Sequence, residues 1–114
     1  MGFTRLGTEI QAEEYYVSEE KRLEGNPLQK LWIEYTDSSE RFCAGIWQSE
    51  KGKWRVSYSE EEYCHILEGI SIVTEDGKDP IQVNTGDRFV ISAGFQGSWE
   101  VVEPTRKHFV VYEK

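Results

Sequence analysis

The sequence predicts an all-β domain, either a sandwich or a barrel built from many short strands. Apolar and polar residues alternate in short runs, Gly-containing turns separate these runs at steady intervals, and no segment shows a strong helical period. A chain of 114 residues is long enough for one domain with one core. Its four Trp, six Tyr and five Phe residues supply buried area that a disordered acidic chain lacks.

The expected strands follow one another with little chain between them. Asp76 and Gly77 mark a strong hairpin turn, because Gly accepts the positive φ that such a turn requires. Gly52 and Gly69 mark two further breaks between apolar runs. In chain order we expect strands at residues 31–35, 41–48, 54–58, 63–67, 70–74, 81–83, 88–92, 98–102 and 107–112.

The first thirty residues differ from the remainder, because they carry many charges and few β-branched side chains. Ser18 is placed to begin a short helical turn that Gly25 ends. Alternatively, the segment around Tyr15 is an arm that packs on the main body or on a partner. We therefore divide the chain into an N-terminal arm or helical turn, residues 1–30, and a barrel, residues 31–114.

Charge and composition exclude several classes of function. The net charge of −8 disfavours binding to nucleic acid or to an anionic membrane surface, both of which require a cationic face. No apolar run approaches the roughly 20 residues of a membrane-spanning helix, and the first residues lack a secretory apolar stretch. The two cysteines form neither a disulfide framework nor a Cys-x-x-Cys pair. These features together predict a cytoplasmic domain.

Two stretches, residues 52–69 and 85–99, resemble the paired motifs of the cupin superfamily. The Glu62 to Gly69 spacing and the turn at Gly86 and Asp87 carry the resemblance, which extends over residues 30–112. The chain is similar to small single-domain cupins related to ureidoglycine aminohydrolase and to an ethanolamine-utilisation cupin. This resemblance implies a double-stranded β-helix, the cupin jelly-roll barrel, and a homodimer.

The metal-ligand positions of the superfamily are mostly replaced in this chain. Metal-binding cupins have two His residues separated by one residue, then a Glu, and a third His in the second motif. The resemblance places these ligands at Val56, Tyr58, Glu62 and Gly97. Only Glu62 retains a ligand side chain, whereas a transition metal normally has three or four protein ligands. We expect neither a metal ion nor another cofactor, and we interpret His65 and His108 as satisfied or surface imidazoles.

Strand alternation predicts which side chains line the barrel. If Glu62 points inward, Cys64 does so as well, and Tyr58 and Trp99 are expected on the same side. The resemblance favours an inward Lys107, although periodicity alone does not decide between Lys107 and its neighbour. An inward carboxylate is costly unless it is paired or protonated, so we expect Glu62 to meet Lys107 or Tyr58.

These residues form the candidate site. The candidate ligand-binding residues are Tyr58, Glu62, Cys64, Trp99 and Lys107. Desolvation favours a neutral carboxyl group and an adjacent ammonium favours a charged one, so Glu62 is a candidate general acid or base. A barrel packed solid by its own side chains is the simpler alternative.

Three functional hypotheses remain open. The first is a metal-independent cupin that binds a small polar molecule, of carboxylate or amide type, inside the barrel, with turnover undecided. The second is a metal-dependent hydrolase resembling ureidoglycine aminohydrolase. The third is a non-catalytic sensor or assembly cupin. Fold alone does not choose among them, because one scaffold of this kind carries many chemistries.

Overall fold

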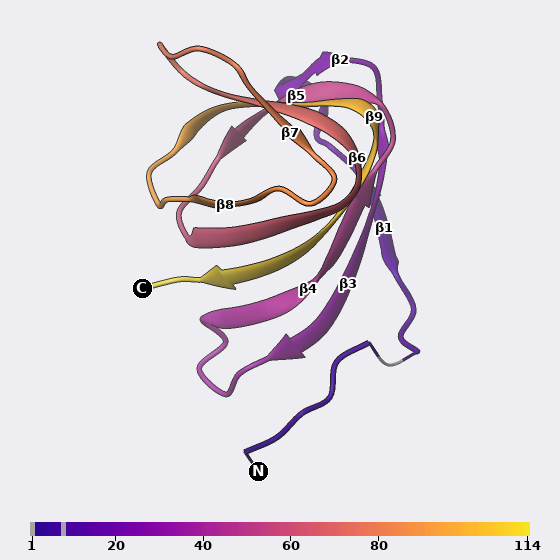
Figure 1. Cartoon of the computed structure of the whole chain (residues 1–114), viewed down its shortest axis with the longest axis vertical. Coiled ribbons are helices and arrows are strands. Elements are labelled where there is room, and N and C mark those ends of the chain that lie inside the picture. The colour runs from indigo at the N-terminus through magenta and orange to yellow at the C-terminus, as the bar shows by residue number, and fades with distance from the viewer. Residues whose placement is uncertain (1, 8) are drawn as a thin grey trace.

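The structure is a computed structural model that describes residues 2–7 and 9–114, and it shows an all-β jelly roll. Its strands curl into a barrel, with β7 and β8 toward one end and the turn between β3 and β4 toward the other (Figure 1). The elements in chain order are β1 (Glu13–Tyr16), η1 (Glu19–Lys21), β2 (Arg22–Glu24), β3 (Leu28–Thr36), β4 (Phe42–Ser49), β5 (Gly52–Ser57), β6 (Glu61–Glu75), β7 (Ile81–Asn84), β8 (Arg88–Ile91) and β9 (Gln96–Tyr112).

Strands β6 and β9 run through both walls of the barrel and pair with each other along most of their length. In the first wall the order is β1-β3-β4-β9-β6-β8, which uses the C-terminal half of β9 and the N-terminal half of β6. In the second wall the order is β2-β5-β9-β6-β7, which uses the other halves. All of these pairings are antiparallel, as a jelly roll requires.

Each of the two long strands bends at a corner where the sequence predicts a break. We expected two strands separated by Gly69, but β6 runs through it as one strand. We also expected two strands separated by residues 103–106, but β9 runs through them as one strand. Gly69 has a φ of 96°, and a Cβ atom there would overlap the carbonyl oxygen of Pro104 on β9. The register of the β6 and β9 pairing shifts around this point. A glycine bulge therefore turns the corner without ending the strand.

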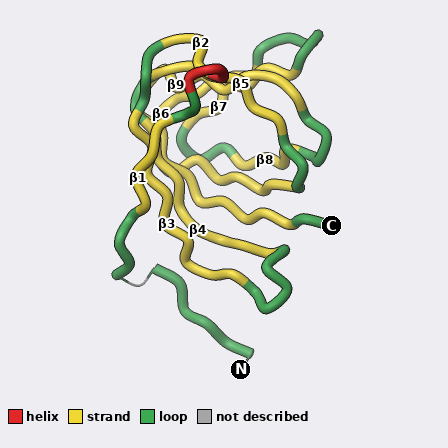
Figure 2. Tube along the Cα trace, turned by 180° about the vertical axis from the view of Figure 1, so that it is seen from behind, coloured by secondary structure: helices red, strands yellow, loops and turns green. Residues whose placement is uncertain are grey.

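The N-terminal segment lies along the barrel's own edges (Figure 2). β1 pairs with β3 and β2 pairs with β5, so each covers the exposed edge of one wall. The expected helical turn is reduced to the 3₁₀ turn η1, and the Ser18 hydroxyl makes no capping hydrogen bond. Between the two strands Val17 is buried in the core, and its carbonyl accepts a hydrogen bond from Arg22 Nε at 3.0 Å.

The core lies between the two walls and is built around three tryptophans. The Trp47 ring meets the Trp99 ring edge-on at a centroid distance of 5.5 Å and the Trp54 ring at 6.1 Å. Ile66 and Val101 are almost fully buried beside them. Rings of this size bury large apolar areas, which is the main stabilising term for a domain this small. Among the residues that the structure describes, no helix is long and apolar enough to cross a membrane.

Candidate functional site

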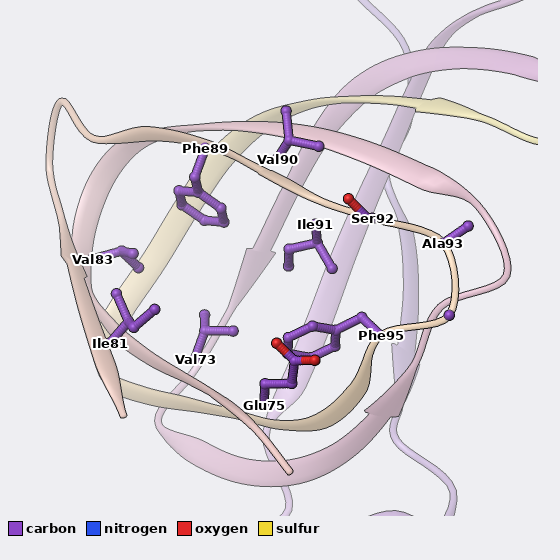
Figure 3. A pocket seen from close by; sticks show the side chains of 11 residues that line it. Val73, Glu75, Ile81, Val83, Phe89, Val90, Ile91, Ser92, Ala93 and Phe95 are labelled. Atoms are coloured by element: carbon purple, nitrogen blue, oxygen red, sulfur yellow. The ribbon is translucent and has the colours of Figure 1, made fainter. Parts of the chain in front are cut away.

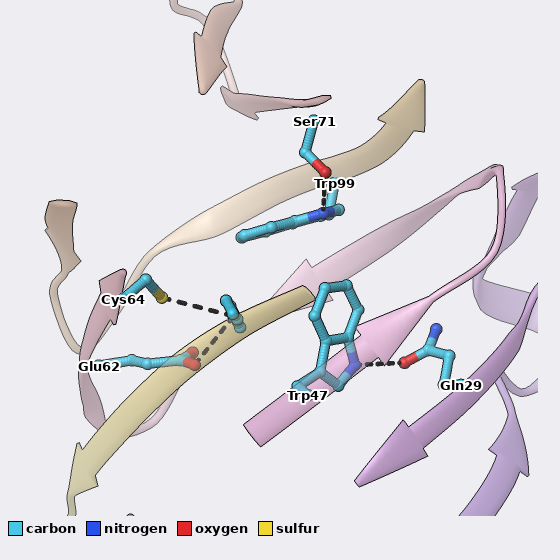
Figure 4. A network of polar contacts seen from close by, with 7 residues as sticks. Gln29, Trp47, Glu62, Cys64, Ser71 and Trp99 are labelled. Carbon is cyan, nitrogen blue, oxygen red and sulfur yellow. Dashed lines mark hydrogen bonds and ion pairs between the residues drawn. The ribbon is translucent and has the colours of Figure 1, made fainter. Parts of the chain in front are cut away.

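A buried ion pair joins the two long strands inside the barrel. Glu62 on β6 and Lys107 on β9 are 8% and 4% exposed, and the distance from Lys107 Nζ to Glu62 Oε2 is 3.0 Å (Figure 4). The alternation of β6 turns Glu62, Cys64 and Ile66 inward together, as the sequence predicts. The structure also settles the face of β9 that periodicity left open, because Lys107 and Phe109 are buried and His108 is exposed.

The ammonium of Lys107 is enclosed by four side chains. Cys64 Sγ lies 3.4 Å from Nζ, and the ring centroids of Trp99 and Trp47 lie 4.4 and 4.9 Å from it. Indole faces attract cations, and the attraction is strongest where water is excluded. Burial is the largest single influence and lowers the pKa of Lys107, but Glu62, Cys64 and Tyr58 together more than offset it, so the pKa lies above its ordinary value. Lys107 therefore stays charged at neutral pH and does not serve as a nucleophile.

The other titratable groups around the pair are held in their neutral forms. Burial raises the pKa of the Cys64 thiol from 9.0 to about 12, although Lys107 opposes the shift. Burial also raises the pKa of the Tyr58 phenol well above its ordinary value of 10.0. A nucleophilic cysteine requires a thiolate, so Cys64 acts here as a buried neighbour of Lys107 and not as a reactive thiol.

These raised pKa values predict a loss of stability at alkaline pH. Cys64, Tyr58 and Lys107 each bind a proton more tightly in the folded protein than in the unfolded chain. Their contribution to stability is complete below the unfolded pKa values and is lost as the pH rises through the folded ones. We expect the free energy of unfolding, measured by urea titration, to decrease from about pH 9 upward. The slope should be about 1.4 kcal/mol per pH unit for each proton that the folded protein keeps and the unfolded chain has lost.

The Cys64→Ala variant tests the first part of this alkaline transition. Because the unfolded thiol ionises before the tyrosine and the lysine, removing it should flatten the pH dependence where the decrease begins. The matched control is Cys43→Ala, which removes the half-buried thiol on β4 and should retain the slope of the unmodified protein. A wild-type stability that does not change between neutral pH and strongly alkaline pH would contradict the prediction.

A cavity of about 310 Å³ opens above the ion pair, which we call the Lys107 cavity. Glu62, Lys107 and Tyr58 line it, as the sequence predicts for three of the candidate residues. Cys64 and Trp99 contact the Lys107 ammonium but do not line the cavity. Leu31 and Ile33 of β3, Cys43 of β4, and Phe109 and Val111 of β9 supply apolar walls.

Three further residues of the site were not foreseen. Trp47 lines the cavity and donates its indole N–H to Gln29 Oε1 at 2.9 Å. Gln29 Nε2 is buried and has no hydrogen-bond partner among the residues that the structure describes. Glu60 lies at the same cavity, and burial is the main cause of its raised pKa. Tyr15 of β1 is half-buried, its pKa is raised by burial, and it lies close enough to Lys107 and Glu62 to interact with both charges.

The signals for these residues were of different kinds. Strand alternation along β4 turns Trp47 to the same face as Cys43, which also lines the cavity. No local sequence pattern places Tyr15 near the site, because its position depends on the pairing of β1 with β3. Trp99 was expected as a wall, but its indole N–H instead donates to Ser71 Oγ at 3.1 Å below the cavity floor.

The four positions that hold a metal ion in metal-binding cupins do not fit one in this chain. Val56 has no donor atom, and Tyr58 is a neutral phenol. Glu62 already pairs with an ammonium. A Cβ atom at Gly97 would overlap the carbonyl oxygen of Thr74 on β6, so no ligand side chain can stand there. Within the described residues, no group of three or more His, Cys, Asp and Glu side chains is arranged to hold a metal ion.

The two histidines lie on the outer face of the barrel and are directly opposite each other. His65 of β6 pairs with His108 of β9, and their ring centroids are 6.5 Å apart. Their sequence positions gave no reason to expect that they meet, because the contact depends on the register between β6 and β9. They lie away from the Lys107 cavity and take no part in it.

Comparison with known proteins supports the fold and the family. The family described as the EutQ-like cupin domain matches residues 36–109. No curated protein matches the chain significantly. Many solved structures do match. Three of them, at 15–20% sequence identity, support the fold alone.

Three of these structures illustrate the similarity. A protein of unknown function of the DUF861 family from Pseudomonas syringae pv. tomato has a TM-score of 0.81 at 17% identity, over 90% of this chain and 44% of its own. This chain therefore spans less than half the length of that protein. The EutQ protein of Clostridium difficile has a TM-score of 0.68 at 20% identity, over 85% and 79% of the two chains. A putative ethanolamine utilization protein from Salmonella typhimurium has a TM-score of 0.66 at 15% identity, over 92% and 98%.

Proposed function

The chain belongs to the EutQ-like cupin family, and from this premise we propose that it binds a small polar organic molecule in the Lys107 cavity without a metal ion. The observation that carries the proposal is the ion pair between Glu62 and Lys107 at the floor of an open cavity. A buried ion pair is often no more stabilising than apolar side chains of the same volume. Its presence under a cavity that is otherwise mostly apolar is typical of a ligand site with a few orienting polar groups.

The charges around the cavity favour a neutral ligand of the amide type over a carboxylate. Lys107 is the cation that lines the cavity, and the Glu62 carboxylate already balances its charge at 3.0 Å. Glu60 adds a second acidic side chain at the cavity wall. A ligand carboxylate would meet this excess of negative charge, whereas an amide can donate to Glu62 and accept from Lys107 or Tyr58.

The polar groups have distinct roles in this proposal. Glu62 accepts a hydrogen bond from the ligand and is the candidate general acid or base, should bound molecules be transformed. Lys107 holds the Glu62 carboxylate in place and supplies a fixed positive charge. Tyr58, with its phenol neutral and packed against Phe95 at a centroid distance of 5.8 Å, offers a donor at the side of the cavity.

Binding of two probes of matched size, propionamide and propionate, tests the proposal. Trp47 lines the cavity, so its fluorescence reports on occupancy. We expect the amide to bind the wild-type protein more tightly than the carboxylate does. Glu62→Gln should weaken amide binding about tenfold, because it replaces a charged acceptor with a neutral one. The metal content of protein purified without chelators should remain well below one transition-metal ion per chain.

The matched control is Glu68→Gln, which alters an exposed glutamate on the same strand. It should leave amide binding unchanged. Equal amide affinities for the wild-type protein and Glu62→Gln would contradict the assignment of the site. A stoichiometric transition metal bound to the purified protein would contradict metal independence and would favour a metal-dependent hydrolase instead.

A further inference from the structure

A second and larger cavity, of about 470 Å³, opens at the other end of the barrel (Figure 3). It lies between β6, β7, β8 and the loop of residues 92–95, and it shares no lining residue with the Lys107 cavity. Aromatic rings stand between the two cavities, with Phe95 against Tyr58 and Phe89 against Trp99 at centroid distances of 5.8 and 6.3 Å. We call this space the Glu75 cavity.

One charged side chain lines this cavity, and the rest of its side-chain wall is almost entirely apolar. The alternation of β6 that turns Ser71 and Val73 inward also turns Glu75 inward, at the end of the strand. In Figure 3 the Glu75 side chain stands among the apolar side chains that line the cavity. Its side chain is 45% exposed, and its partner Lys78, with Nζ at 3.7 Å, is 70% exposed. Such an exposed pair is weak, so a ligand can displace Lys78.

The backbone around the cavity offers little to an anion. The Ala93 N–H donates to Glu61 Oε2 at 2.7 Å, the Gly94 N–H donates to the Tyr58 carbonyl at 2.7 Å, and the Phe95 N–H donates to the Ser92 carbonyl at 3.1 Å. These donors are therefore occupied within the chain. The Glu75 carboxylate is an acceptor only, so a ligand that uses it must bring N–H or O–H groups.

We propose that the Glu75 cavity is a second ligand site, specific for a primary ammonium compound with an apolar, preferably aromatic, body. The ammonium group binds the Glu75 carboxylate, and the body packs against Val73, Val83 and Ile91 and the rings of Phe89 and Phe95. A ring face near an ammonium group adds cation–π attraction. This proposal does not depend on the function assigned to the Lys107 cavity, because the two sites have separate linings.

Three probes that share a phenyl ring and a short chain test the class of ligand. They are 2-phenylethylamine, 2-phenylethanol and 3-phenylpropanoate, which carry a cation, a neutral group and an anion. Titrations followed by the NMR signals of the Val83 and Ile91 methyl groups report on this cavity. We expect saturable shifts with the amine, weaker binding of the alcohol and the weakest binding of the carboxylate.

Two charge variants and one control separate the role of Glu75 from simple apolar binding. Glu75→Gln should weaken the amine about fivefold and the alcohol much less, because it removes the charge interaction but keeps an oxygen that accepts a hydrogen bond. Lys78→Ala should tighten the amine about twofold, since it removes a competing cation. Glu68→Gln, on the outer face of the same strand, should change neither affinity.

The proposal is overturned if the amine produces no saturable shift of these methyl groups in the wild-type protein. It is equally overturned if the carboxylate binds as well as the amine, or if Glu75→Gln leaves the amine affinity unchanged. Ile81 and Val90 line the same cavity and are exposed. Sedimentation that shows a dimer, dissociated by Val90→Lys and unaffected by the amine, would assign the cavity to a second copy of the chain and would also overturn the proposal.

Discussion

Replacing Lys107 with methionine should destabilise the protein by about 3–5 kcal/mol, because it leaves the buried Glu62 carboxylate without its partner. The loss is large for a domain of this size, whose total stability is of the order of 5–15 kcal/mol. Methionine is close to lysine in length and is apolar, so lost packing contributes little. Urea unfolding monitored by tryptophan fluorescence measures the difference in the free energy of unfolding.

The double variant Glu62→Leu with Lys107→Met separates the unpaired charge from the loss of lysine itself. Apolar residues of similar volume often replace a buried ion pair at little cost, so the double variant should recover most of the lost stability. A double variant as unstable as Lys107→Met would show that the unpaired carboxylate is not the cause. A cost below about 1 kcal/mol for Lys107→Met would show that water already screens the pair.

The pH dependence of Lys107→Met provides an independent check. An unpaired buried carboxylate is relieved by taking up a proton. The stability deficit of Lys107→Met relative to the wild-type protein should therefore shrink as the pH is lowered. The deficit of the double variant, which has no carboxylate at this position, should not follow this trend. A deficit that is constant with pH in both variants would contradict the assignment.

Much of the site followed from strand alternation and from the resemblance to cupins. Alternation placed Glu62 and Cys64 on one face, and the cost of a lone buried carboxylate predicted a partner for Glu62. The choice of Lys107 over His108 came from the resemblance, and the structure confirms it. The turn at Asp76 and Gly77 was also predicted correctly from its local chemistry.

What local patterns could not supply was the contact between distant segments. Tyr15 approaches the ion pair only because β1 pairs with β3, and His65 meets His108 only because of the register between β6 and β9. The corner at Gly69 was read as the end of a strand, since a single glycine in an apolar run marks a break and a bulge equally well. Each of these features is long-range, so periodicity over a short window does not encode it.

Gly97 gives the second large effect that we expect. A Gly97→Ala substitution should cost about 3 kcal/mol, because the added Cβ atom would overlap the backbone carbonyl oxygen of Thr74 on the neighbouring strand. Its φ is not among the positive values in the chain, so backbone strain is not the reason. The control is Gly77→Ala, because Gly77 has a positive φ of 81° but open space where the Cβ atom would stand. Backbone strain alone should there lower the free energy of unfolding by about 1 kcal/mol. Urea unfolding compares the two variants.

The Gly97 result also bears on the absence of the third histidine of metal-binding cupins. The space that a Cβ atom at position 97 would need is filled by the backbone of β6. Gly97→His therefore cannot restore a metal ligand without moving β6 away from β9. Such a movement would disturb the pairing that holds both walls together. Gly97→His should therefore be at least as destabilising as Gly97→Ala, and added zinc should not rescue it. A stable Gly97→His protein whose unfolding midpoint rises with zinc would show that the strands can separate there and that only the side chain was lost.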